Sequence, residues 1–284
     1  MIEWILALSS FLVRMSFALS NGHRLPELGL GTFRLTEAQS LTDIIHCALQ
    51  TGYRNIDTAS LYRNETAIGT ALKSQTLPRE AYTITTKVWN TDQGYDGTIA
   101  AFEASRKRLN LDYIDLYLIH WPIQSQLAGT WRAMEALCKS GWVRSIGVSN
   151  FSIDHLTELM DIATIPPMVN QIEFHPGHQS PTLIQFCQDH DILVQAWAPV
   201  MRGQATQIPL LQHLAHKYET TASGICLAWI KARHIMSLPK SQNTARIKAN
   251  FEAQILRLDD ADIEAINALD LQNRLGPPRH HFWH

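Results

Sequence analysis

From residue 25 onward, short apolar runs alternate with segments of helical periodicity, and this alternation constrains the fold more than any other feature of the sequence. Several runs are apolar throughout, as in Leu116-Tyr117-Leu118-Ile119, which is typical of parallel strands buried on both faces. The predicted strands are residues 28–33, 55–58, 82–88, 115–120, 145–149, 169–174, 193–198 and 235–239. Strands that alternate with helices in this way over about 250 residues predict a single-domain α/β protein, a (β/α)8 TIM barrel.

A doubly wound parallel sheet is the alternative fold for such an alternation. That fold would carry a glycine-rich GxGxxG turn after its first strand. The run Gly29-Leu30-Gly31-Thr32 does not complete this turn, so the barrel is favoured.

The two ends of the chain are expected to differ from the barrel, which we place at residues 25–284. The first 24 residues are predicted to be an extension, apolar but interrupted by Glu3 and Arg14. Three interpretations stay open for it: a stretch upstream of a true translation start at Met15 or a disordered tail, an export or anchor signal, and ordered structure. From about residue 271 we expect a tail, whose His-rich and aromatic end at 279–284 is interpreted as a flap rather than a metal site.

Charge and cysteine content exclude several classes of protein. The net charge of −2 implies no basic face, so nucleic-acid binding is not expected. The four cysteines lie far apart and include no CxxC pair, so neither a metal site nor a disulfide framework is indicated. We expect buried thiols in a cytoplasmic protein without stable membrane association.

Four residue types that can carry chemistry fall at the ends of predicted strands. Asp57, Lys87 and His120 lie at the ends of the second, third and fourth strands, and Tyr62 follows Asp57 by five residues. A barrel places its active site at the C-terminal ends of its strands. Taken singly, each residue could be a cap, a solvent-facing charge or a core group. Burying all four polar groups at one rim would be costly without a function, so we predict a catalytic cluster.

Four motifs around these residues resemble those of the aldo-keto reductase family. They are GYRNIDTASLY at 52–62, DYIDLYLIHWP at 112–122, GVSNF at 147–151 and LPKS at 238–241. The resemblance runs from about residue 25 to residue 278, and the short segment between Pro122 and Trp131 is similar to compact bacterial members of the 2,5-diketo-D-gluconate reductase type. It implies a barrel that reduces carbonyl compounds with NADPH.

The resemblance also implies a catalytic role for each rim residue. Tyr62 would give a proton to the carbonyl oxygen as hydride is added. Lys87 would lower the pKa of the Tyr62 phenol, which is ordinarily near 10, and Asp57 would hold Lys87 charged and oriented. His120 would orient the carbonyl and stabilise its developing charge.

The cofactor and substrate contacts follow from the same resemblance. Ser149, Asn150 and Gln171 are assigned to the nicotinamide carboxamide, and Trp197 replaces the tyrosine that usually stacks on the ring. Cations and a helix N-terminus suit the 2′-phosphate of NADPH. The full set of predicted cofactor residues is Thr32, Ser149, Asn150, Gln171, Trp197, Lys240, Ser241, Asn243, Arg246 and Asn250. The predicted substrate pocket is formed by Phe33, Trp89 and Trp121, with Phe282 or Trp283 from the tail.

The sequence therefore predicts a monomeric NADPH-dependent reductase for small carbonyl compounds: aldehydes, α-dicarbonyls such as methylglyoxal, or keto-sugar acids. The alternative is a catalytically weak barrel that binds NADPH as a redox sensor or structural partner. A metal-dependent hydrolase ranks last, because the strand ends show no cluster of His and carboxylates with ligand spacing.

Overall fold

The computed structural model describes residues 16–36, 38–271 and 273–277, and its centre is an eight-stranded parallel sheet in the order β10-β9-β8-β7-β6-β5-β4-β3. The strands are β3 (Leu30–Gly31), β4 (Asn55–Asp57), β5 (Thr83–Val88), β6 (Ile114–Ile119), β7 (Val143–Ser149), β8 (Val169–Glu173), β9 (Leu193–Trp197) and β10 (Met236–Leu238). Backbone hydrogen bonds close the barrel between its first and last strands, from Gly29 N to Ser237 O at 2.9 Å and from Gly31 N to Pro239 O at 3.0 Å. The predicted TIM barrel is confirmed, and the doubly wound alternative is wrong.

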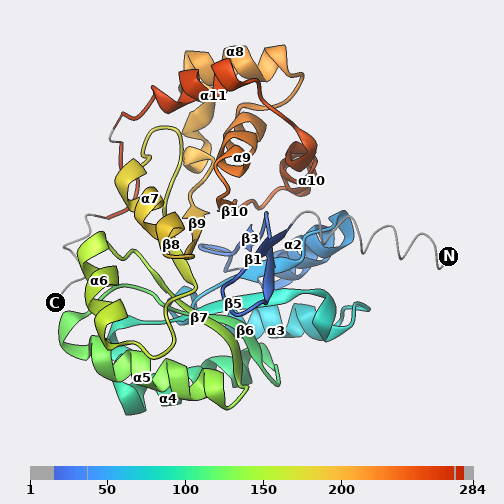
Figure 1. The fold of residues 1–284 in the computed structure, drawn as a ribbon. Coiled ribbons are helices and arrows are strands. Elements are labelled where there is room, and N and C mark those ends of the chain that lie inside the picture. The colour runs from blue at the N-terminus through green and yellow to red at the C-terminus, as the bar shows by residue number, and fades with distance from the viewer. Residues whose placement is uncertain (1–15, 37, 272, 278–284) are drawn as a thin grey trace.

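Helices follow the strands in sequence and surround them in space (Figure 1). They are α2 (Ala38–Thr51), α3 (Glu65–Lys73), α4 (Tyr95–Leu109), α5 (Leu127–Lys139), α6 (Ile153–Ile162), α7 (Pro181–Asp189), α8 (Pro209–Lys217), α9 (Ala222–Ala232), α10 (Thr244–Glu252) and α11 (Asp260–Asn267). The eight predicted strand ranges differ from the observed strand ends by at most two residues. None of the described helices is long and apolar enough to cross a membrane.

Alternate residues of the strands face two different apolar layers. Along β6, Leu116 and Leu118 belong to the cluster inside the barrel, whereas Tyr117 and Ile119 belong to the layer between strands and helices. Successive side chains of a strand point to opposite faces, so a continuously apolar run fills both layers. The core is therefore packed below the C-terminal rim, and polar residues gather at that rim.

A short antiparallel hairpin covers the inner layer. Its strands are β1 (Ser16–Ala18) and β2 (Arg24–Pro26), paired from Ser16 opposite Pro26 to Ala18 opposite Arg24. Leu19 and Leu25 are buried against the inward-facing Leu116 and Leu118. The boundary that we placed between residues 24 and 25 thus falls within β2, and residues 16–24 are part of the folded structure. Residues 1–15, with Glu3, Arg14 and the proposed start at Met15, lie outside the described residues.

Candidate active site

A pocket of about 400 Å³ opens among the C-terminal ends of the strands. It gathers residues that are far apart in sequence, most of which lie in or directly after strands β3 to β10. The pocket is lined by Gly31, Thr32, Phe33, Arg34, Asp57, Leu61, Tyr62, Trp89, His120, Trp121, Ser149, Asn150, Gln171, Trp197, Ala198, Pro199, Val200, Arg202, Leu238, Lys240 and Pro277. The rim is thus where the predicted catalytic residues meet.

A buried ion pair joins the second and third strands of the barrel. Lys87 Nζ donates to Asp57 Oδ1 at 2.7 Å and to the carbonyl oxygen of Thr58 at 2.8 Å. The side chains are 0% and 6% exposed, so the ammonium lies away from solvent behind the pocket wall. Burial lowers the pKa of Lys87, and the charge and hydrogen bond of Asp57 oppose that shift. Asp57 therefore stabilises a charge that the protein interior disfavours.

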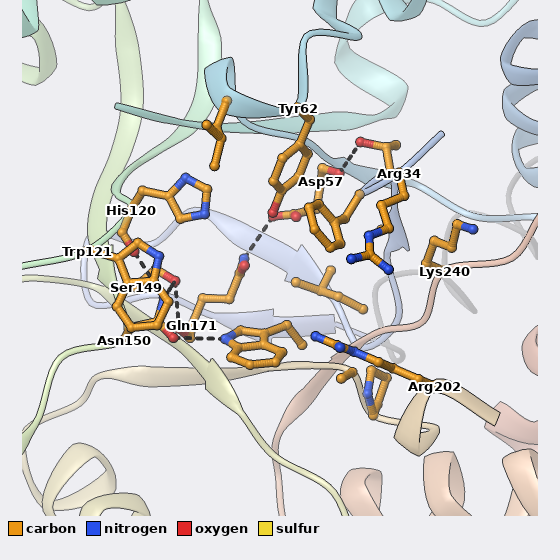
Figure 2. Close-up of a pocket in the computed structure, with 18 of the residues that line it drawn as sticks. Arg34, Asp57, Tyr62, His120, Trp121, Ser149, Asn150, Gln171, Arg202 and Lys240 are labelled. Carbon is orange, nitrogen blue, oxygen red and sulfur yellow. Dashed lines mark hydrogen bonds between the residues drawn. The ribbon is translucent and has the colours of Figure 1, made fainter. Parts of the chain in front are cut away.

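Tyr62 and His120 face each other across the pocket (Figure 2). Their ring centroids are 5.7 Å apart at an angle of 78°, and the ring centroids of Trp89 and His120 are 5.0 Å apart. Lys87 Nζ lies 5.2 Å from the centroid of the Tyr62 ring. A carbonyl oxygen between Tyr62 and His120 would therefore meet a phenol and an imidazole at once.

The pKa of Tyr62 does not shift in the direction that we expected. Burial raises it well above its ordinary value, and the charge of Asp57 raises it further. The positive charge of Lys87 is paired with Asp57, so it does not offset the loss of solvation at the phenol. Tyr62 thus stays protonated at neutral pH, as a proton donor must, but it is not an acidified phenol.

His120 is neutral in this environment. Burial lowers its pKa well below the usual value, and the charge of Lys87 lowers it further. Its Nδ1 is buried and has no hydrogen-bond partner among the described residues. A neutral imidazole carries one N–H, which can donate to a carbonyl oxygen without bringing a full charge.

The opposite wall of the pocket is fixed by hydrogen bonds between neighbouring strands. Asn150 is in the left-handed region at φ 64°, which Asn tolerates better than most residues. Its Nδ2 donates to the carbonyl oxygen of His120 at 3.0 Å, and its Oδ1 accepts from Trp197 Nε1 at 3.0 Å. Ser149 Oγ donates to the carbonyl oxygen of Gln171 at 2.8 Å. The indole of Trp197 is therefore held in one orientation beside two amide side chains.

Three cations lie on the side of the pocket away from His120 and Trp121: Arg34, Arg202 and Lys240 (Figure 2). No described carboxylate forms an ion pair with any of them. Burial lowers the pKa of Lys240, and the charge of Arg34 lowers it further, because like charges so close repel. Such a cluster favours an anionic ligand.

Lys240 was predicted from the sequence, whereas Arg34 and Arg202 were not. Arg34 follows Phe33, a residue that we had assigned, and adopts a φ of 61°. Arg202 lies in the turn after β9, again in the left-handed region, with a φ of 51°. Arg34 directly follows the predicted strand 28–33, so the strand-end signal could have found it, whereas Arg202 lies four residues past the predicted strand 193–198.

The residues assigned to the phosphate end fall just beyond the pocket, at the start of α10. Asn243 caps this helix by accepting from the backbone N–H of Arg246 at 3.1 Å. Ser241 Oγ accepts from Asn243 N at 3.0 Å, and Arg246 is exposed. Asn250 is buried in the second half of α10. Of this group only Lys240 lines the pocket itself.

Aromatic side chains form the mouth above Tyr62. The rings of Phe33 and Tyr62 lie 5.0 Å apart, and Phe33 is 44% exposed. Trp89 and Trp121 also line the pocket, so the structure brings together the three residues predicted for the substrate side. Phe282 and Trp283 lie outside the described residues.

A buried carboxylate fastens the end of the described chain to this site. Glu173, at the end of β8, accepts hydrogen bonds from the backbone N–H groups of Leu275 and Gly276 and from His175 Nε2, the last at 3.3 Å. Arg274 Nε lies 3.6 Å from its Oε2. Burial alone would raise the pKa of Glu173, but the hydrogen bonds outweigh it and lower the pKa below its usual value. We predicted no catalytic or binding role for Glu173.

The family is settled by comparison with known proteins. Residues 27–271 match the model of the Aldo/keto reductase family. The chain belongs to the aldo-keto reductase family. It is 43% identical over 259 residues to the glyoxal reductase of Bacillus subtilis, covering 91% of this reductase and 94% of the relative.

Solved structures agree with this assignment. An aldo-keto reductase from a Medee basin deep-sea metagenome library is 41% identical, with a TM-score of 0.90 over 92% of this reductase and 97% of that chain. The Bombyx mori aldo-keto reductase in complex with NADP is 33% identical, with a TM-score of 0.86 over 92% and 94% of the two chains. The reductase is thus an oxidoreductase of a family whose members bind NADPH or NADP.

Proposed function

We propose that this reductase uses NADPH to reduce small aldehydes, α-dicarbonyls such as methylglyoxal, or keto-sugar acids to alcohols. The observation that carries the proposal is the division of the pocket. Tyr62 and His120 lie at one end, with the Lys87–Asp57 pair beside Tyr62, and the cations Arg34, Arg202 and Lys240 lie at the other.

The residues present fit a nicotinamide dinucleotide. The three cations, which have no described carboxylate partner, suit phosphate groups, and Ser241, Asn243 and Arg246 continue this surface at the N-terminus of α10. Trp197 offers a flat surface fixed by Asn150. Thr32, Ser149, Gln171 and Asn250 complete the proposed cofactor contacts, and the bound cofactor would supply the hydride.

The chain's own groups would carry the proton and the charge. Tyr62 donates its proton to the carbonyl oxygen, because an alkoxide is a much stronger base than a phenolate. His120 donates its N–H to the same oxygen and orients the substrate. Lys87 provides positive charge beside the phenol and steadies the negative charge left on Tyr62, while Asp57 keeps Lys87 charged.

The proposal includes a cytoplasmic monomer. Residues from β3 to β10 of one chain line the pocket, so the proposed reaction needs no second copy. The four cysteines are free thiols, two of them half-buried, which suits a reducing compartment.

The test is NADPH consumption with methylglyoxal and with an aromatic aldehyde, for the wild type and for Tyr62→Phe. We expect the wild type to turn over and Tyr62→Phe to lose turnover. The dissociation constant for NADPH should be the same in the two proteins. Tight NADPH binding without turnover in the wild type would contradict the proposal and favour an NADPH-binding sensor.

A further inference from the structure

The interior of the barrel contains a pair of glutamine side chains where barrels usually pack apolar residues. Gln171 on β8 and Gln195 on β9 are opposite each other in the parallel register, and Met236 on β10 continues the same level. The exposed fractions of the two glutamines are 2% and 0%. A buried amide is costly unless its donors and acceptors are paired, so the partners of each amide indicate what it does.

Both N–H groups of Gln171 are already engaged. Nε2 donates to Asp57 Oδ2 at 2.8 Å, as Figure 2 shows, and to Gln195 Oε1 at 2.9 Å. A carboxylate only accepts hydrogen bonds, so the contact with Asp57 requires the nitrogen of Gln171, and not its oxygen, on this side. No described residue donates to Gln171 Oε1, and Gln171 lines the pocket. Its amide thus presents an acceptor to a ligand.

Gln195 determines this orientation together with Asp57. Its own Nε2 lies 3.2 Å from Met236 Sδ, which leaves its carbonyl oxygen turned toward Gln171. Gln195 is not among the residues that line the pocket, so it can affect a ligand only through its neighbour. It lies two residues before Trp197 on the same strand, and residues two apart share a face.

We propose that Gln195 is a positioning residue for the cofactor: it holds the Gln171 amide so that Oε1 accepts a hydrogen bond from the N–H of the nicotinamide carboxamide. This inference rests on the proposed function. The Gln195 amide is connected through Gln171 to Asp57, and Asp57 in turn accepts from Lys87. The cofactor end and the proton-donor end of the pocket therefore share one chain of hydrogen bonds.

The experiment measures the dissociation constants of three ligands by quenching of tryptophan fluorescence. The ligands are NADP, its 3-acetylpyridine analogue, which has a methyl ketone and no N–H to donate, and 2′-phospho-ADP-ribose, which lacks the nicotinamide. We expect the wild type to prefer NADP over the analogue by about three- to tenfold, the value of one hydrogen bond.

Variants of Gln195 separate positioning from packing. Gln195→Leu removes the acceptor at similar size, so the preference for NADP should fall to about one- to twofold while 2′-phospho-ADP-ribose binds as in the wild type. Gln195→Glu should restore the preference, since a carboxyl oxygen accepts in either protonation state. Val194→Ala is the matched control, because Val194 is the neighbouring buried residue of β9 and packs in the strand–helix layer. It should keep the full preference.

The outcomes distinguish the two claims. If the wild type binds neither NADP nor 2′-phospho-ADP-ribose, the proposed function fails. If it binds both and Gln195→Leu retains the wild-type preference, or weakens 2′-phospho-ADP-ribose equally, the positioning role is overturned and the proposed function stands. If Gln195→Leu does not fold, the role is judged on Gln195→Glu, which must keep the preference.

Discussion

Gly276 lies so close to the indole of Trp197 that a Cβ at this residue would be 2.3 Å from Trp197 Cη2. The same Cβ would be 3.0 Å from Glu173 Oε2. The backbone of the C-terminal segment is thus packed between the proposed stacking surface and the carboxylate that holds the segment. Any side chain at residue 276 must displace one of the two.

Gly276→Ala should therefore impair cofactor binding. Overpacking of a filled site costs about 1–3 kcal/mol, so we expect kcat/KM for NADPH to fall at least about fivefold. Steady-state kinetics measures this, with Asn273→Ala as the control, because Asn273 is an exposed residue of the same segment. Wild-type kinetics in Gly276→Ala would show that Trp197 can move freely.

Removing the partner of Lys87 should destabilise the fold as well as the reaction. Asp57→Asn leaves a buried ammonium without its counter-charge, which costs about 3–5 kcal/mol in the free energy of unfolding. Urea denaturation measures the loss. Asp57→Asn combined with Lys87→Met replaces the pair by neutral groups, so it should recover much of the stability and none of the activity. Equal stability of the wild type and Asp57→Asn would contradict this account.

The pH dependence of catalysis should lack a contribution from His120. An exposed His titrates near pH 6.5, but burial and the charge of Lys87 lower the pKa of His120 well below that value, so the ring is neutral throughout the neutral range. We expect log kcat/KM to stay level between about pH 6 and 8. A fall below pH 7 that disappears in His120→Gln would show instead that the ring is protonated there.

Rising pH should first affect Lys87 rather than Tyr62. Burial lowers the pKa of Lys87 and raises that of Tyr62, so the ammonium loses its proton at a lower pH than the phenol does. The alkaline fall in kcat/KM should therefore begin at a lower pH than an ordinary lysine would give, while ultraviolet difference spectra show no tyrosinate signal from Tyr62. A tyrosinate signal that Tyr62→Phe removes, titrating together with activity, would reverse this order.

Glu173→Gln should release the C-terminal segment. A carboxylate that accepts several N–H groups contributes about 1.5–3 kcal/mol per charged hydrogen bond, and the amide replaces one acceptor by a donor. Trypsin should then cut after Arg274 at least about tenfold faster than in the wild type. Glu252→Gln, at an exposed helix residue, is the control. Unchanged cleavage would mean that packing alone holds the segment.

The carboxylate of Glu173 should also make attachment of the C-terminal segment depend on pH. Because the pKa of Glu173 lies below its usual value, the ionised group stabilises the folded state at pH values above about 4.3. This contribution is lost as the pH falls through the lowered pKa. Segment release in the wild type should therefore appear only in acid and should be absent near neutrality.

The barrel could be predicted because buried parallel strands leave a direct mark on the sequence. A run such as Leu116–Ile119 must be apolar at every residue, since alternate side chains enter two different apolar layers. The hairpin of β1 and β2 leaves no such mark. Its strands have three residues each, and only Leu19 and Leu25 around them are fully buried, too few for a period to be read.

The site was predictable where function coincides with a strand end and less so elsewhere. Asp57, Lys87 and His120 follow from strand position, whereas Arg202 depends on the path of a turn. Glu173 lies near the end of a predicted strand, but the backbone N–H groups that it holds in the tail are about a hundred residues away in sequence. The rise in the pKa of Tyr62 depends on desolvation and on the nearby charge of Asp57, which only the folded chain reveals.

The hairpin of β1 and β2 covers the end of the barrel opposite the pocket. Leu19 and Leu25 pack there against the inward-facing leucines of β6. In the described part of the chain, the pocket therefore opens at the C-terminal rim. A long dinucleotide and a small carbonyl compound would both have to enter through this opening. A ligand bound deeper in the pocket would be covered by the second one, so under the proposed function the deeper ligand would bind first and leave last.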